Sequence, residues 1–201
     1  RRRLVLGFAY LLAPRISEMA AAQMGDFQRR EGRWWWRVVG KGDKLANIPV
    51  PDDMLELLME WRRSLDLPAL PEPDEEGPLL RALDGQRGLG DNQLYRLIKS
   101  AFDEAATAIA LELGEEATGM VKTLRQASPH WLRHTAITHQ AQSGIELRYL
   151  AKNARHARLD TTARYLHTEA EEWQRQMRAH GVTPYDSSES VEKDAEGRET
   201  I

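Results

Sequence analysis

Residues 128–135 read Ser-Pro-His-Trp-Leu-Arg-His-Thr, and they carry the densest group of reactive side chains in the sequence. Serine is a favoured helix N-cap and proline a favoured first helical residue, so Ser128-Pro129 predicts a helix that continues to about Gln142. On that helix His130 and Arg133 are three residues apart and share a face. Arginine offers a planar fork for phosphate oxygens, and histidine exchanges a proton near neutral pH. The pair therefore indicates a site for an anionic oxygen.

Helices dominate the rest of the predicted fold. Apolar periodicity and end signals predict helices over residues 3–12, 17–24, 52–65, 91–113, 145–153 and 169–180, and another that begins after residue 160. Asp91 is the expected N-cap of the long helix over residues 91–113. Asp160 is the expected N-cap of the helix that begins at residue 161. Residues 114–119 break the helical pattern, and residues 181–201 are polar, acidic and expected to be a disordered tail.

A small sheet accompanies the helices. β-Propensity predicts strands over residues 34–39 and 45–50, with a turn at 40–43 between them. Residues 79–83 are the candidate for a short third strand. The expected fold class is therefore α+β, mainly α-helical with a small three-stranded antiparallel sheet.

The formal net charge of −3 hides an uneven distribution. Residues 1–50 carry ten basic and four acidic side chains, and residues 121–168 carry eight and two, so each segment has a net charge of +6. Residues 51–120 have a net charge of −10 and residues 169–201 of −5, which completes the total of −3. A face that binds a polyanion could be built from the two basic segments although the whole chain is acidic.

Composition excludes several classes of protein. The 201 residues include no cysteine, so disulfides, thiolate metal sites and cysteine nucleophiles are impossible. No apolar run approaches the roughly 20 residues that cross a bilayer, so we expect a cytoplasmic protein that does not bind membranes.

Three further stretches accompany residues 128–135 in a fixed order. They are Pro14-Arg15-Ile16-Ser17-Glu18, then Gly40-Lys41-Gly42-Asp43-Lys44 followed by Ile48-Pro49-Val50, and finally His156 with Asp160-Thr161-Thr162, Tyr165 and His167. Together, the four boxes resemble the catalytic domain of the tyrosine recombinase (phage integrase) family over residues 3–180. The family's separate N-terminal core-binding domain is not expected within this chain, so we expect weak DNA binding by the chain alone.

Two positions depart from the family pattern. The usual Gly-Leu before the first arginine is Ala13-Pro14 here, and the usual Leu-Gly before the second histidine is Ala154-Arg155. Neither departure removes a catalytic side chain. The stretch over residues 107–125 is also longer than the family usually needs.

The resemblance implies cleavage of a DNA phosphodiester by a tyrosine hydroxyl, with Tyr165 as nucleophile. Arg15 and Arg133 would clamp the non-bridging oxygens of the phosphate, and Lys41 would protonate the leaving 5′-oxygen. His130 and His156 would hydrogen-bond the phosphate, with His130 a candidate acceptor of the tyrosine proton.

Supporting roles follow from the same resemblance. Glu18, one helical turn from Arg15, would orient the site from behind. Lys44, Arg155 and Arg158 are expected at DNA phosphates. No metal is expected, because Arg15 and Arg133 would clamp the phosphate oxygens. No high-energy cofactor is expected either, because the phosphotyrosine stores the energy of the broken bond. The implied partners are double-stranded DNA and further copies of the chain, in a synaptic tetramer on DNA and as a monomer or weak oligomer without it.

Alternatives remain open for single residues and for the whole chain. Lys44 competes with Lys41 as the hairpin lysine, and His130, His134 and His139 could be read as a metal patch on one helix. The rival functions are a type IB topoisomerase, a non-catalytic DNA-binding relative and a metal-dependent hydrolase. Tyr165 is preferred among the five tyrosines because a histidine precedes it by nine residues and its flanks are polar.

Overall fold

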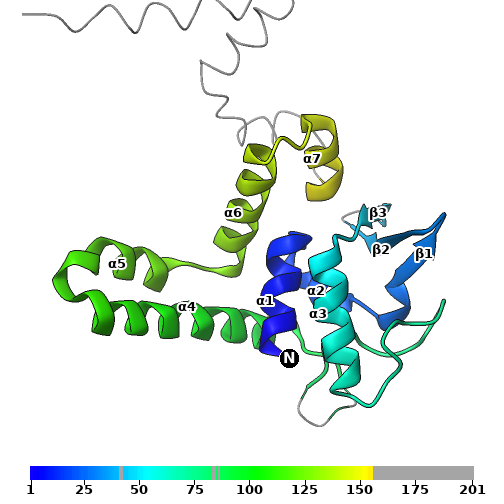
Figure 1. The fold of residues 1–201 in the computed structure, drawn as a ribbon, viewed down its shortest axis with the longest axis horizontal. Helices are drawn as coiled ribbons and strands as arrows, with labels where there is room; N and C mark the ends of the chain where they lie inside the picture. Colours follow the sequence, from blue (N-terminus) through cyan, green and yellow to red (C-terminus); the bar gives the residue numbers. More distant parts are fainter. Residues whose placement is uncertain (41–42, 83–84, 86, 156–201) are drawn as a thin grey trace, which may run out of the picture. The chain divides into compact units, whose positions relative to one another are not determined.

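The computed structural model describes residues 1–40, 43–82, 85 and 87–155, which form helices and one antiparallel sheet (Figure 1). The elements in chain order are α1 (Arg2–Leu11), α2 (Ile16–Ala21), η1 (Met24–Asp26), β1 (Phe27–Arg30), β2 (Arg33–Val39), β3 (Leu45–Pro49), α3 (Asp52–Arg63), α4 (Asp91–Leu113), η2 (Gly114–Ala117), α5 (Thr118–Gln126), α6 (Pro129–Gln142) and α7 (Leu147–Ala154). The mainly helical α+β class predicted from the sequence is confirmed. The helices expected after residue 160 and the tail over 181–201 lie outside the described residues.

The sheet has the strand order β1-β2-β3, and β1 corrects the sequence prediction. Residues 79–83 were expected to complete the sheet, but the strand that does so is β1 (Phe27–Arg30); Arg81 forms an isolated bridge with Gly88. Strand β1 pairs with β2 through a tight turn at Glu31 and Gly32, which both have positive φ values of 50° and 78°. Such a two-residue turn matches the twist of antiparallel strands. The polar sequence of β1 gives little β-propensity, so the pairing comes from the turn and from one buried side chain.

The long helix α4 and its successor α5 also differ from the prediction at their ends. Helix α4 has Gly90 rather than Asp91 at its N-cap, where the Gly90 N–H donates to Oε1 of Gln93 over 3.1 Å. After α4 the chain turns at Gly114, whose φ of 58° suits glycine. It then forms η2 within the stretch over 114–119 where a break was expected, and continues as α5, a helix that was not predicted from the sequence. Helices α4 and α5 contact each other along this hairpin (Figure 1).

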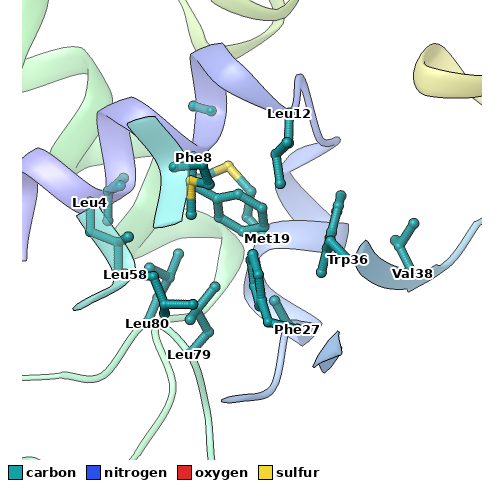
Figure 2. Packing of buried hydrophobic residues seen from close by; sticks show 14 of the residues in the cluster. Leu4, Phe8, Leu12, Met19, Phe27, Trp36, Val38, Leu58, Leu79 and Leu80 are labelled. Atoms are coloured by element: carbon teal, nitrogen blue, oxygen red, sulfur yellow. The ribbon is translucent and has the colours of Figure 1, made fainter. Parts of the chain in front are cut away.

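The main core lies between the sheet and helices α1, α2, α3 and α4. Phe8 of α1 meets Trp36 of β2 edge to face, with ring centroids 4.9 Å apart, and Phe27 of β1 stacks on the same indole (Figure 2). Met19 of α2 and Leu58 of α3 are buried in the same cluster. Burial of these large side chains holds the first helices on the sheet.

A second, smaller cluster attaches the C-terminal helices to this body. It joins Ala13, in the turn between α1 and α2, to Ala136 and Ile137 of α6 and Ala154 of α7. Three of the four side chains are alanine, so the backbones approach closely. This packing places the start of α2 beside α6 and the end of α7, although these segments are more than 100 residues apart in the sequence.

None of the described helices combines the length and the apolar composition needed to cross a membrane.

Candidate active site

Arg15 is held at the start of α2 by a residue one helical turn later. It is the N-cap of α2, and its backbone N–H donates to Oε2 of Glu18 over 2.6 Å. Its guanidinium Nη1 donates to Oε1 of the same carboxylate over 2.8 Å. The Arg15 side chain remains 35% exposed, so an edge of this cation is accessible to a ligand.

Arg133 connects the turn before Arg15 to the end of α7. Its side chain is buried, and its Nη1 and Nη2 donate to the carbonyl oxygens of Ala13 and Ala154. The Nη2 of Arg15 donates to the carbonyl of Arg155 over 3.2 Å. The two arginines that the sequence predicted for one phosphate are thus anchored on adjacent carbonyls at the C-terminus of α7.

Glu18 and Arg155 form a buried ion pair behind Arg15. The Nε and Nη2 atoms of Arg155 donate to the two Glu18 oxygens over 3.0 and 2.5 Å, and the two side chains are only 5% and 4% exposed. Burial by itself raises the pKa of Glu18, but the charge of Arg155 and the hydrogen bonds from Arg155 and Arg15 outweigh it and lower this pKa. Burial also lowers the pKa of the Arg155 guanidinium, and Glu18 opposes that effect. Glu18 is therefore a carboxylate inside the protein.

His130 and His134, the two histidines of residues 128–135, contact each other on α6. The Nε2 atoms of His130 and His134 lie 2.7 Å apart, and both side chains are exposed. Although His134 is exposed, the partial loss of its hydration, and then the positive charges of His130 and Arg133, lower its pKa below the ordinary value of 6.5. His139 instead contacts the hydroxyl of Tyr10 on α1, with 2.7 Å between Nδ1 and the oxygen. Within the described part of the chain, no three His, Asp or Glu side chains are grouped as metal ligands.

The hairpin between β2 and β3 carries the candidate lysines. Lys44 is exposed, and its carbonyl accepts the Gly40 N–H over 2.8 Å, which closes the base of the turn. Lys41 at the tip lies outside the described residues, as do His156, Arg158 and Tyr165. Their places in the site stay predictions from the sequence.

Sequence reasoning missed the Ala13 carbonyl, which accepts hydrogen bonds from both Arg133 and Arg155. Ala13 has a φ of 46° and Arg155 a φ of 52°, so both adopt the left-handed conformation that favours glycine. These are the two positions at which the sequence departs from a usual glycine. The sequence signal for this special backbone geometry was therefore the family's usual glycine, which Ala13 and Arg155 replace.

Comparisons with known proteins identify the family of this chain. The profile of the phage integrase family matches residues 1–172. A tyrosine recombinase of Synechococcus elongatus is 32% identical over 158 residues, which cover 76% of this chain and 42% of that protein. The tyrosine recombinase XerC of Mycobacterium sp. strain KMS is 33% identical over 167 residues, with coverages of 83% and 49%. The chain thus spans about half the length of the curated relatives it matches.

Solved structures show the same fold. The XerH site-specific recombinase bound to difH substrate, in a pre-cleavage complex, superposes with a TM-score of 0.64 at 21% identity, covering 90% of this chain and 47% of that one. The Tn1549 transposon integrase in complex with transposon right end DNA gives a TM-score of 0.61 at 15% identity, with coverages of 90% and 58%. From the family profile over residues 1–172, supported by these relatives, we conclude that the chain belongs to the phage integrase family.

Proposed function

We propose that this chain is the catalytic domain of a site-specific DNA recombinase, which cleaves and rejoins strands through a 3′-phosphotyrosine at Tyr165. The observation that carries the proposal is the joint anchoring of Arg15 and Arg133 on the adjacent carbonyls of Arg155 and Ala154. Two guanidinium groups fixed in this way suit one phosphate, whose non-bridging oxygens gain negative charge in the transition state.

The remaining chemistry is assigned to four side chains. The Tyr165 hydroxyl attacks phosphorus and loses its proton, for which His130 is the candidate acceptor. The bond from phosphorus to the 5′-oxygen breaks, and Lys41 donates the proton that the leaving oxygen takes up. His156 hydrogen-bonds the phosphate throughout. Attack by a 5′-hydroxyl on the phosphotyrosine then reverses these steps on another strand.

No metal or cofactor enters this scheme. The arginines supply the positive charge that a metal ion would otherwise bring, and removing one preorganised donor of this kind typically costs about 10²–10³ in rate. Type IB topoisomerase activity is not favoured, because the curated relatives of this chain are tyrosine recombinases by name. The same names disfavour a non-catalytic DNA-binding protein.

Double-stranded DNA is the proposed partner. Related folds have been solved in complex with DNA, among them the XerH recombinase and the Tn1549 integrase. We further propose that copies of the chain assemble as a synaptic tetramer on DNA, in the cytoplasm at the nucleoid. Exposed Lys44, together with Arg158, is proposed to contact DNA phosphates beside the cleaved one.

The test uses nicked suicide duplexes with a randomised central segment, because the target site is not known. Wild-type protein is expected to form a covalent adduct that survives denaturing electrophoresis, and sequencing of the adducts identifies the site. Tyr165→Phe is expected to form none, whereas Tyr95→Phe, which changes an exposed tyrosine of α4, behaves as wild type. An adduct that persists in Tyr165→Phe contradicts the assignment of the nucleophile. EDTA is expected to leave the adduct yield unchanged.

A further inference from the structure

Arg155 occupies an unusual place at the end of α7. It is the C-cap of that helix, has φ and ψ of 52° and 42°, and directly precedes the candidate catalytic residue His156 in the chain. A bulky side chain in the left-handed region is uncommon and costs conformational energy. Such an outlier persists only where the surroundings over-determine it, so the contacts of this side chain need an explanation.

The guanidinium of Arg155 is enclosed by the protein. Besides Glu18, it contacts the carbonyl of Asn153 through Nη1 at 2.6 Å and the carbonyl of Ala13 through Nη2 at 3.2 Å. Its Cζ lies 5.5 Å from the ring centroid of Trp36, within the range of a cation–π contact. With these bonds, four of the five N–H donors of the group already have acceptors. The side chain is therefore directed inward, with only 5% of it exposed.

Arg155 and Arg15 share one carboxylate. Oε1 of Glu18 accepts from Nη1 of Arg15 and Nε of Arg155, over 2.8 and 3.0 Å. Oε2 accepts from the Arg15 backbone N–H and from Nη2 of Arg155. Because one negative charge lies between two cations, it neutralises neither of them completely. Arg15, Arg133, Arg155 and Glu18 together carry three positive charges and one negative charge, which leaves a net charge of +2.

Arg155 also connects the backbone acceptors of the site. It shares the Ala13 carbonyl with Arg133, and its own carbonyl accepts Nη2 of Arg15. Displacing the Arg155 side chain would loosen Glu18 and the Ala13 turn at once. Arg15 and Arg133 would then lose the fixed spacing that two donors on one phosphate require.

We propose that Arg155 is a positioning residue of the active site, which holds Glu18 and the Ala13 carbonyl so that Arg15 and Arg133 face one phosphate. This inference rests on the proposed recombinase function. It assigns to Arg155 a role in the rate of cleavage, in contrast to the DNA-phosphate contact expected from the sequence alone.

The experiment separates the rate of cleavage from the affinity for DNA. Single-turnover cleavage of a suicide duplex is measured at saturating DNA, and the Kd is measured in parallel on an uncleavable duplex. Arg155→Met is expected to slow cleavage by up to about 100-fold while the Kd changes by less than about threefold. Arg155→Lys, which keeps the charge but lacks the fork, is expected to recover part of the rate. The matched control Arg148→Met changes a 65% exposed arginine of the same helix and is expected to cleave as wild type.

A double variant tests the shared carboxylate. Glu18→Gln with Arg155→Met removes both buried charges. The double variant should therefore cleave faster than the rate predicted by multiplying the rate reductions of the two single variants. Independent effects of the two substitutions on the rate would overturn the proposal. Arg155→Gly, which suits the left-handed backbone, gives a second readout if Arg155→Met does not fold, and it is likewise expected to cleave slowly.

Two other outcomes have distinct meanings. If Arg155→Met weakens the Kd and lowers the slope of log affinity against log salt by about one, with an unchanged cleavage rate, Arg155 is a DNA contact and the inference is wrong. If the wild-type protein itself forms no covalent adduct with any duplex, the recombinase function fails, and the inference that rests on it fails with it.

Discussion

The Nε2 atoms of His130 and His134 lie 2.7 Å apart, one helical turn from each other on α6. A hydrogen bond between two ring nitrogens needs one N–H and one lone pair, so at least one of the two rings is neutral. Partial desolvation and the adjacent positive charges of His130 and Arg133 lower the pKa of His134, so the His134 ring is neutral at pH 7. His134 therefore sets how the candidate phosphate ligand His130 is oriented, in the way that a hydrogen-bond partner fixes one nitrogen of a ring.

This pair predicts a dependence of stability on pH that disappears in a variant. The pKa of His134 lies below its unfolded value of 6.5, so the unfolded chain binds more protons between these two values. The free energy of unfolding should accordingly fall as the pH falls from 6.5 through the folded pKa. In His134→Asn this contribution to the pH dependence should be lost. NMR titration of the ring protons measures the pKa directly, and a His134 value at or above 6.5 would contradict the assignment.

Glu18 predicts a second loss of stability at more acid pH. Its pKa is lowered from the ordinary value of 4.5, so its contribution is complete above 4.5 and is lost as the pH falls through the folded value. Glu18→Gln leaves Arg155 buried without its carboxylate, and we expect the free energy of unfolding at pH 7 to drop by about 3 kcal/mol. Urea denaturation at several pH values measures this difference, which should shrink towards acid pH. The control Glu104→Gln changes an exposed partner of Arg2 and should have little effect.

Ala13 predicts a well-tolerated glycine substitution next to the active site. Its φ of 46° places a Cβ atom in the left-handed region, where glycine is not strained. Relief of that strain should offset the entropy that glycine loses on folding and the loss of the buried Ala13 methyl, so Ala13→Gly should change the free energy of unfolding by less than about 1 kcal/mol. Thermal and urea denaturation check the change. Ala136→Gly, in the middle of α6, should instead destabilise by about 1 kcal/mol or more, and equal effects of the two substitutions would refute the strain argument.

The agreement between sequence and structure is greatest where local signals act alone. Ser128 caps α6 as predicted, with its Oγ accepting the Trp131 N–H over 3.2 Å, and the helix ends at Gln142 as expected. Strand β2 follows its aromatic and β-branched residues. By contrast, β1 has three polar residues in a row after Phe27, and only its turn and the pairing with β2 make it a strand. Residues 79–80 were candidates for that strand because they are apolar, but they are buried in the core instead.

By itself, the sequence predicted which residues belong to the active site, because four boxes in a fixed order resemble the catalytic domain of the tyrosine recombinase family. It also determined most helix starts, which depend on capping by neighbouring residues. Only the tertiary structure decided that Arg15 and Arg133 meet at the end of α7, and that Arg155 points inward to Glu18. Those contacts join residues up to 142 positions apart, and they depend on close packing of Ala13, Ala136, Ile137 and Ala154, which no local pattern specifies.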